Sequence, residues 1–89
     1  MARYLRLDEA ASELTKQLGA NCKKRRDALG MSQAELAERS GVAASHISHI
    51  EHGTANPTLE VLENLAQGLQ TTVIELLTIE KPQELSNLS

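Results

Sequence analysis

Apolar residues recur along this chain at spacings that favour helices. The first run predicts a long helix that starts near Ala11, with Asp8 as its N-cap, and ends at Gly30. Only the arginines at positions 25 and 26 interrupt its apolar stripe. The stripe repeats every four or seven residues on one helix face and comprises Leu14, Leu18, Cys22 and Leu29.

Two short helices are predicted next. Ser32 and Glu35 have the spacing of a capping box, in which two side chains satisfy backbone amides at a helix start, and Gly41 suits the end of that helix. A third helix is expected over residues 44–51. Gly53 follows it in a position suited to the left-handed conformation that ends many helices.

Two threonines stand where helix caps are expected further along. Thr58 precedes a fourth apolar stripe, and Thr72 with Glu75 has capping-box spacing before a short fifth helix. The fifth helix has more apolar side chains than one or two turns need for a single core, so we expect self-association there. The predicted dimer-interface residues are Val73, Ile74, Leu76 and Leu77.

Composition supports one small all-α domain. The 89 residues include a single aromatic side chain, and the 40% that are apolar are mostly Ala, Leu, Ile and Val, which suit close-packed helices. We expect a compact five-helix domain over residues 11–79. An N-terminal arm with two arginines over residues 1–10 and a flexible C-terminal tail over residues 80–89 would flank it.

Charge is distributed unevenly. Residues 1–39 hold eight Lys and Arg against six acids, for a net +2, whereas residues 40–89 hold one Lys against six acids, for a net −5. Few free cations predict weak sequence-independent attraction to phosphates. The chain has no charged-then-apolar leader, no 18-residue apolar run and only one cysteine. A cytoplasmic protein without membrane contact or internal disulfide is therefore expected.

The second and third helices have the pattern of a helix-turn-helix, in which the helices cross steeply and the second is exposed. The turn between them is SGVA. At about 100° per residue, Ala43, Ile47 and Ile50 share an inward face of the third helix. The outward face comprises Ser45, Ser48, His49 and His52, with His46 at its margin.

Three histidines spaced three residues apart raise the question of a metal site. Such a site would need a further donor and a converging geometry. We therefore expect His49 and His52 to contact a groove or phosphates, with solvated surface as the alternative, and His46 to be partly packed. Cys22 suits a small core residue. No nucleophile with a base, phosphate-cradling loop or carboxylate pair occurs, so no enzyme activity, metal or cofactor is expected.

A long segment of the chain resembles a known family. Phage-repressor-like, XRE-type transcriptional regulators have a helix-turn-helix similar to MSQAELAERSGVAASHISHIEHGTANPTLEVLENLAQGL, and the resemblance covers roughly Leu18 to Leu77. Its strongest elements are SQAELAERSGV, the I-x-x-I-E-x-G of residues 47–53 and NPT at residues 56–58. The resemblance implies a compact five-helix, lambda-repressor-like domain that usually dimerises and places its third helix in the DNA major groove.

The resemblance also implies roles for individual residues. Arg26 and Glu51 match positions that form a structural ion pair between the first and third helices. Gln33 matches a position that contacts the phosphate backbone and braces a base-reading side chain, and Thr54 and Asn56 match loop positions that meet phosphates. The predicted DNA-binding set is Gln33, Ala43, Ala44, Ser45, Ser48, His49, His52, Thr54 and Asn56.

Departures from the family pattern fall on the predicted interface and on one turn. Ala43 stands where relatives often carry a Ser or Thr cap, which is typically worth about 1 kcal/mol. Basic residues that relatives often have near Ala44, His52 and Thr54 are absent, and Gln70 replaces a common glycine. These departures predict modest affinity for the phosphate backbone.

The function expected from the resemblance is sequence-specific binding of double-stranded DNA by a homodimeric regulator. Its two recognition helices would lie about 34 Å apart on a near-palindromic operator. The sequence leaves open a phage-type repressor, a restriction-modification controller or an antitoxin-like regulator, and a protein partner such as a toxin or a polymerase subunit. The rival interpretation is a protein-interaction module that keeps the fold but binds little or no DNA.

Overall fold

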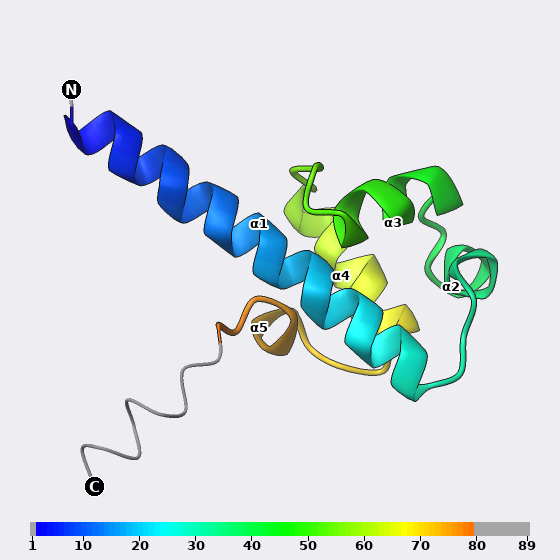
Figure 1. The fold of residues 1–89 in the computed structure, drawn as a ribbon. Helices are drawn as coiled ribbons and strands as arrows, with labels where there is room; N and C mark the ends of the chain where they lie inside the picture. The colour runs from blue at the N-terminus through cyan, green and yellow to red at the C-terminus, as the bar shows by residue number, and fades with distance from the viewer. Residues whose placement is uncertain (1, 80–89) are drawn as a thin grey trace, which may run out of the picture.

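The computed structural model describes residues 2–79, and their side chains from residue 13 onward. Over these residues the chain is helical and contains no strand, which confirms the expected all-α fold. The shorter helices gather around the second half of the longest one (Figure 1). The elements are α1 (Ala2–Ala28), α2 (Gln33–Ser40), α3 (Ala44–Glu51), α4 (Leu59–Gly68) and α5 (Val73–Leu76).

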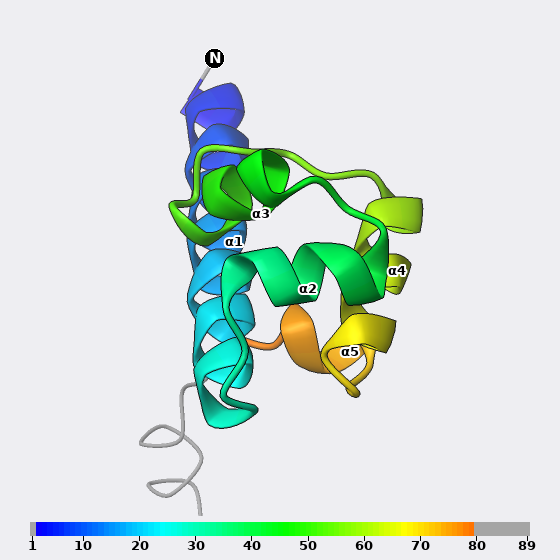
Figure 2. The ribbon, with the colours of Figure 1, turned by 90° about the vertical axis from the view of Figure 1, so that its right-hand side faces the viewer.

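Helix α1 is longer than its apolar pattern predicted. It begins at Ala2 and runs through Asp8, so the expected N-cap at Asp8 is wrong, and the expected arm over residues 2–10 is the first part of α1. This stretch has neither Gly nor Pro and is rich in helix-forming Ala, Leu and Arg, so nothing in it ends the helix. The first turns extend past the other helices in Figures 1 and 2. The tail over residues 80–89 lies outside the described residues.

Side-chain caps begin three of the short helices, as predicted. The Ser32 hydroxyl accepts a hydrogen bond from the Glu35 amide at 3.0 Å, and the Glu35 carboxylate accepts one from the Ser32 amide at 2.9 Å. The hydroxyls of Thr58 and Thr72 accept amide hydrogen bonds at the starts of α4 and α5. Helix α3 is the exception, because Ala43 at its N-cap provides no side-chain acceptor.

The core fixes α3 against α1 through an unusually close approach. A Cβ atom on Gly19 of α1 would collide with the carbonyl oxygens of Ile50 and Glu51, so only glycine permits this helix crossing. The end of α3 therefore has a defined position on the domain. The largest fully buried core side chains, drawn from all five helices and the segment after α4, are Cys22, Leu36, Ile47, Ile50, Leu65, Leu69 and Leu76.

Helix α5 is held against α1 by hydrogen bonds to its backbone. Asn21 donates to the carbonyl oxygen of Leu76 at 2.9 Å, and Arg25 donates to two carbonyl oxygens in the turn before α5 at 2.8 and 2.7 Å. Leu76 is only 2% exposed, because the single turn of α5 directs this side chain into the domain's own core. The prediction that Leu76 lies in a dimer interface is therefore wrong.

Candidate nucleic-acid interface

Helices α2 and α3 form the predicted helix-turn-helix, connected by residues 41–43 (Figure 2). Gly41 ends α2 with φ 77°, a left-handed conformation that glycine adopts without steric cost, and its amide donates to the Ala37 carbonyl oxygen at 2.9 Å. The connection is too short to cover α3. The first residues of α3 are consequently exposed at the surface.

The two faces of α3 separate as the helical spacing predicted, except that Ala43, expected on the inward face, is exposed because it precedes the first turn of the helix. Ile47 and Ile50 are each 1% exposed and belong to the core. We call the side chains of Ala44, Ser45, Ser48, His49 and His52 the outer face of α3; Ser48 is half-buried and the other four are exposed. His46, at the margin, is half-buried as expected. The outer face is thus available to a partner over most of its extent.

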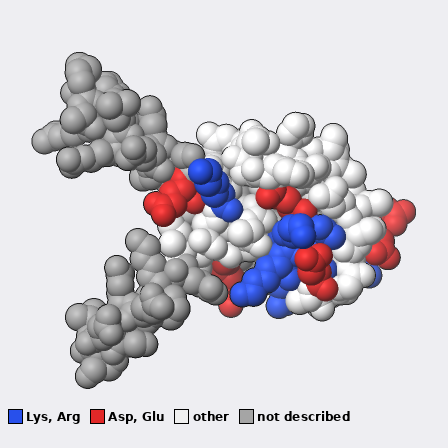
Figure 3. All heavy atoms as spheres, in the orientation of Figure 1, with Lys and Arg blue, Asp and Glu red and all other residues white. Residues whose placement is uncertain are grey.

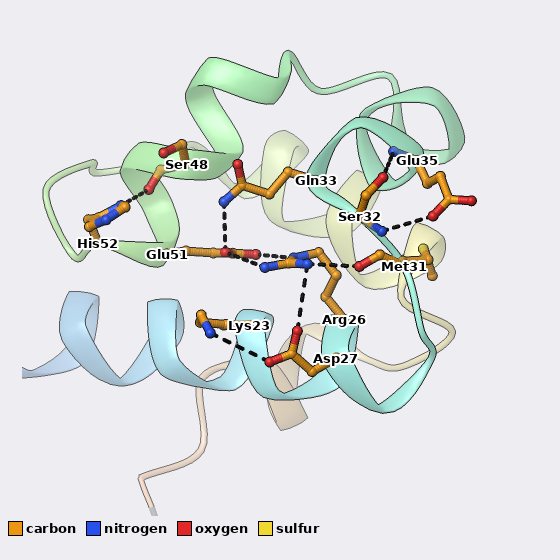
Figure 4. A network of polar contacts seen from close by, with 10 residues as sticks. All are labelled: Lys23, Arg26, Asp27, Met31, Ser32, Gln33, Glu35, Ser48, Glu51 and His52. Carbon is orange, nitrogen blue, oxygen red and sulfur yellow. Dashed lines mark hydrogen bonds and ion pairs between the residues drawn. The ribbon is translucent and has the colours of Figure 1, made fainter.

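An ion pair joins the inner side of α3 to α1, as the resemblance implied (Figure 4). The Arg26 guanidinium donates to both carboxylate oxygens of Glu51, at 2.7 and 3.0 Å, in a bidentate arrangement. Its remaining terminal nitrogen donates to the Met31 carbonyl oxygen at 2.7 Å. The Glu51 side chain is 3% exposed and that of Arg26 is 11% exposed, so the pair is largely shielded from solvent. It therefore fixes geometry between helices that are far apart in sequence.

The same contacts set the protonation of Glu51. Burial raises the pKa of this carboxyl, but hydrogen bonds from Arg26 and Gln33, together with the charges of Arg26 and Lys23, outweigh burial and leave the pKa below its usual value. Hydrogen bonding to Glu51 also raises the pKa of Arg26. Both groups are consequently charged at neutral pH, which the bidentate pair requires.

The side chain of Gln33, at the start of α2, contacts Glu51 and not one of the predicted base-reading side chains. Its amide nitrogen donates to Glu51 at 3.0 Å, so the side chain braces the buried carboxylate (Figure 4). The brace therefore connects α2 with the inner side of α3. Contact between Gln33 and a phosphate stays a prediction.

Comparison with known proteins identifies the family. Residues 23–76 match the helix-turn-helix family HTH_3. The chain belongs to this family. It is 36% identical to the uncharacterized HTH-type transcriptional regulator y4dJ of Sinorhizobium fredii over 66 residues. This matched segment covers 74% of this chain and 86% of the relative. The family consists of transcriptional regulators, not enzymes, so the expectation that the chain is no enzyme is confirmed.

A control protein and a restriction-modification controller protein are among the proteins similar to this chain. Control protein C.SmaI of Serratia marcescens is 39% identical over 61 residues, which cover 68% of this chain and 73% of that protein. The solved structure of the restriction-modification controller protein C.AhdI from Aeromonas hydrophila superposes with a TM-score of 0.67 and 32% identity, over 70% of this chain and 94% of that one. The expected helix-turn-helix fold is confirmed by this agreement.

On the face drawn in Figure 3, charged side chains lie mostly away from α3. In Figure 3 the Lys and Arg side chains gather over the second half of α1, whereas the surface over α3 is largely free of either sign. The one carboxylate of α3, Glu51, is turned inward. Lys23 is paired with Asp27 at 3.5 Å, which removes part of the nearby positive charge. The outer face of α3 is consequently polar without being charged.

Two contacts at the end of α3 were not predicted from the sequence. Nδ1 of His49 lies 3.3 Å from the Thr54 hydroxyl, and Nδ1 of His52 lies 2.7 Å from the Ser48 carbonyl oxygen. The first depends on the loop after α3 folding back by five residues, which no helical spacing reveals. Thr54 is therefore joined to the outer face of α3, whereas Asn56 is exposed in the same loop.

Metal ligands do not converge in this HTH_3 domain. Within residues 13–79, no group of three or more His, Cys, Asp and Glu side chains is placed to hold a metal ion. Cys22 is 1% exposed, and burial followed by the nearby Glu51 charge raises the pKa of its thiol to about 12. It acts as a core residue. Among the described helices, none has the length and apolar character to cross a membrane.

Proposed function

We propose that the protein is a sequence-specific regulator of transcription that binds double-stranded DNA by placing the outer face of α3 in the major groove. One observation carries the proposal: α3 is fixed from within by buried side chains, while its outer face is mostly polar, uncharged and largely exposed. Small polar side chains there can approach base edges closely. Ser45 and His49 are the main base-edge candidates, and Ala44 and Ser48 line the same surface.

Phosphates would be bound around this base-reading surface. The first amides of α3 have no side-chain cap at Ala43, so they can donate to a phosphate at the positive end of the helix. Gln33 and Asn56 would supply further contacts on both sides of the groove through N–H groups of their side-chain amides. Because few unpaired cations surround α3, we expect a shallow salt dependence.

A homodimer would place two such helices on one operator. Ile74 of α5 is 79% exposed, and Val73 and Leu77 beside it are half-buried, so these three residues form the proposed dimer interface. Exposed apolar side chains of this kind favour association. The likeness to the restriction-modification controller protein C.AhdI supports a controller role over a phage-type repressor or an antitoxin.

DNA binding is tested by a gel-shift with the upstream region of the gene, at low and at moderate salt. We expect a discrete complex that survives excess unrelated duplex, with an affinity about 1000-fold or more above that for unrelated sequence. Micromolar binding without sequence preference, or no binding, would instead identify a protein-interaction module.

The proposed interface is tested by Ile74→Glu, which places a charge on an exposed residue and so leaves the core intact. We expect a folded monomer in analytical ultracentrifugation, with weakened operator binding. Leu59→Glu is the matched control, because Leu59 is also apolar and 74% exposed but lies on α4. Dimers that persist in Ile74→Glu, or are lost only in Leu59→Glu, would move the interface away from α5.

A further inference from the structure

The exposed histidines of α3 are both held at Nδ1, which determines which ring nitrogen carries the proton. A neutral imidazole has one donor and one acceptor nitrogen, and the partner of one nitrogen sets the state of the other. Nδ1 of His52 faces the carbonyl oxygen of Ser48 at 2.7 Å. A carbonyl oxygen can only accept, so Nδ1 of His52 carries the proton and Nε2 keeps a free lone pair.

The same conclusion holds for His49, through the loop that follows α3. The Thr54 hydroxyl lies 3.1 Å from the His49 carbonyl oxygen and donates its only proton there. The Thr54 amide donates to the same carbonyl at 3.0 Å, which fixes the threonine on the last turn of α3. With its proton committed, the hydroxyl can only accept from Nδ1 of His49, 3.3 Å away. Nε2 of His49 is then an acceptor.

An acceptor on the outer face of α3 selects among base edges. In the major groove the exocyclic amines of adenine (N6) and cytosine (N4) are donors, whereas guanine and thymine present acceptors. We propose that His49 reads an exocyclic amine through Nε2, and that Thr54 is a positioning residue that imposes this preference by holding the proton on Nδ1. This proposal rests on the proposed function, because it names the base chemistry that the outer face of α3 recognises.

The neighbouring side chains make His49 the decisive residue for this preference. Ser45, one helical turn earlier, has a hydroxyl that can both donate and accept, so it tolerates either kind of base edge. His46 is half-buried, and its ring has no hydrogen bond among the described residues. His52 lies at the C-cap of α3, beyond the turn that would enter the groove most deeply. His49 is therefore the fixed acceptor best placed to discriminate between bases.

The proton position can be measured in the free protein, without any DNA. Long-range proton-nitrogen NMR at about pH 8, the upper end of the range in which histidines change charge, distinguishes the two tautomers. We expect Nδ1–H at His49 and His52. Thr54→Val, which removes the hydroxyl at similar volume, should release His49 and leave His52 unchanged, and Thr54→Ser should restore the original signal. A proton on Nε2 of His49 in the unaltered protein would overturn the inference.

The base chemistry is tested by selecting binding sites from a randomised duplex pool with the unaltered protein and with His49→Ala. The base pair at which His49→Ala loses preference is then rebuilt with two analogues. One lacks the exocyclic amine, and the matched 7-deaza purine lacks the N7 acceptor. We expect loss of the amine to weaken binding about 3- to 10-fold, as for one lost hydrogen bond, and to have no effect in His49→Ala.

The outcomes separate the two proposals. Sensitivity to N7 and not to the amine would mean that His49 donates, and would overturn this inference while leaving DNA binding intact. A selection in which His49→Ala alters the base preference at no position would likewise overturn this inference and leave DNA binding intact. Absence of any enriched sequence with the unaltered protein would refute the proposed function itself, and the reading by His49 with it.

Discussion

The inner and outer faces of α3 differ in what their side chains contact. Inward, Ile47, Ile50 and Glu51 reach α1 and the core, and each of these side chains is at most 3% exposed. Outward, Ser45 and His49 are exposed, and the hydrogen bond of the His49 side chain is to Thr54, in the loop that follows α3. The position of the helix is thus fixed from inside. The outer residues are consequently free to differ according to the DNA sequence that is read.

The largest effect is expected from breaking the inner face at Glu51. Glu51→Ala leaves the buried Arg26 without its carboxylate, which we expect to lower the free energy of unfolding by about 3–5 kcal/mol. Urea unfolding monitored by circular dichroism measures the loss. Arg26→Met combined with Glu51→Leu is the control, because replacing both charges by apolar groups should cost much less. Equal losses in the single and double variants would mean that packing, not the ion pair, stabilises this face.

Acid offers a milder way to weaken the same contact. Because the folded state lowers the pKa of Glu51, its contribution to stability is complete above the unfolded value of about 4.3 and is lost as pH falls through the folded value. The stability difference between the unaltered protein and Glu51→Gln should therefore shrink in acid. Unfolding in urea at a series of pH values measures it. A difference that stayed constant through acid pH would show that the Glu51 charge contributes nothing.

On the outer face, Ser45→Glu should change binding and stability in opposite directions. Ser45 is in the first turn of α3, where the interaction of a carboxylate with the helix dipole stabilises the fold by about 0.3–1 kcal/mol. The same charge would face DNA phosphates, so we expect affinity for the selected duplex to fall more than about tenfold, or about 1.4 kcal/mol. Fluorescence anisotropy measures the affinity.

Gln67→Glu is the control for that change, since Gln67 is exposed on α4 and gains the same charge. It should reduce affinity far less than Ser45→Glu does. Similar losses in both variants would reflect net charge alone and would remove the argument for a specific surface.

The smallest effect concerns the starts of α2 and α3. Ser32 caps α2 through its hydroxyl, whereas Ala43 gives α3 no such acceptor. Ala43→Ser should therefore stabilise the domain, and Ser32→Ala should destabilise it, each by about 1 kcal/mol in thermal unfolding. If Ala43→Ser gave no gain, the start of α3 would already have another source of stabilisation.

Local sequence signals predicted most of the fold. The capping residues at positions 32, 58 and 72 marked helix starts because each acts within three residues of itself. Asp8 misled because a capping residue can also occupy a helix interior when no breaker precedes it. Gln70 adopts φ 57°, so the turn keeps the left-handed conformation of the glycine that it replaces in the family pattern.

The candidate site was predicted less completely, because part of it depends on tertiary placement. The resemblance supplied the Arg26–Glu51 pair, which is confirmed, and helical spacing supplied the outer face of α3. Neither could show that Leu76 turns into the core, since apolar content alone does not distinguish the two sides of a one-turn helix. The bond between His49 and Thr54 likewise requires the loop conformation. The predicted phosphate and base contacts stay predictions.

The most direct test of α3 as the reading element is backbone amide NMR of the protein titrated with the selected duplex. We expect the largest chemical-shift changes over residues 43–49, with smaller ones at Gln33 and Thr54, and little change over the exposed side of α4. Shifts confined to α4 or to the first turns of α1, with α3 unaffected, would contradict the proposal that α3 enters the groove.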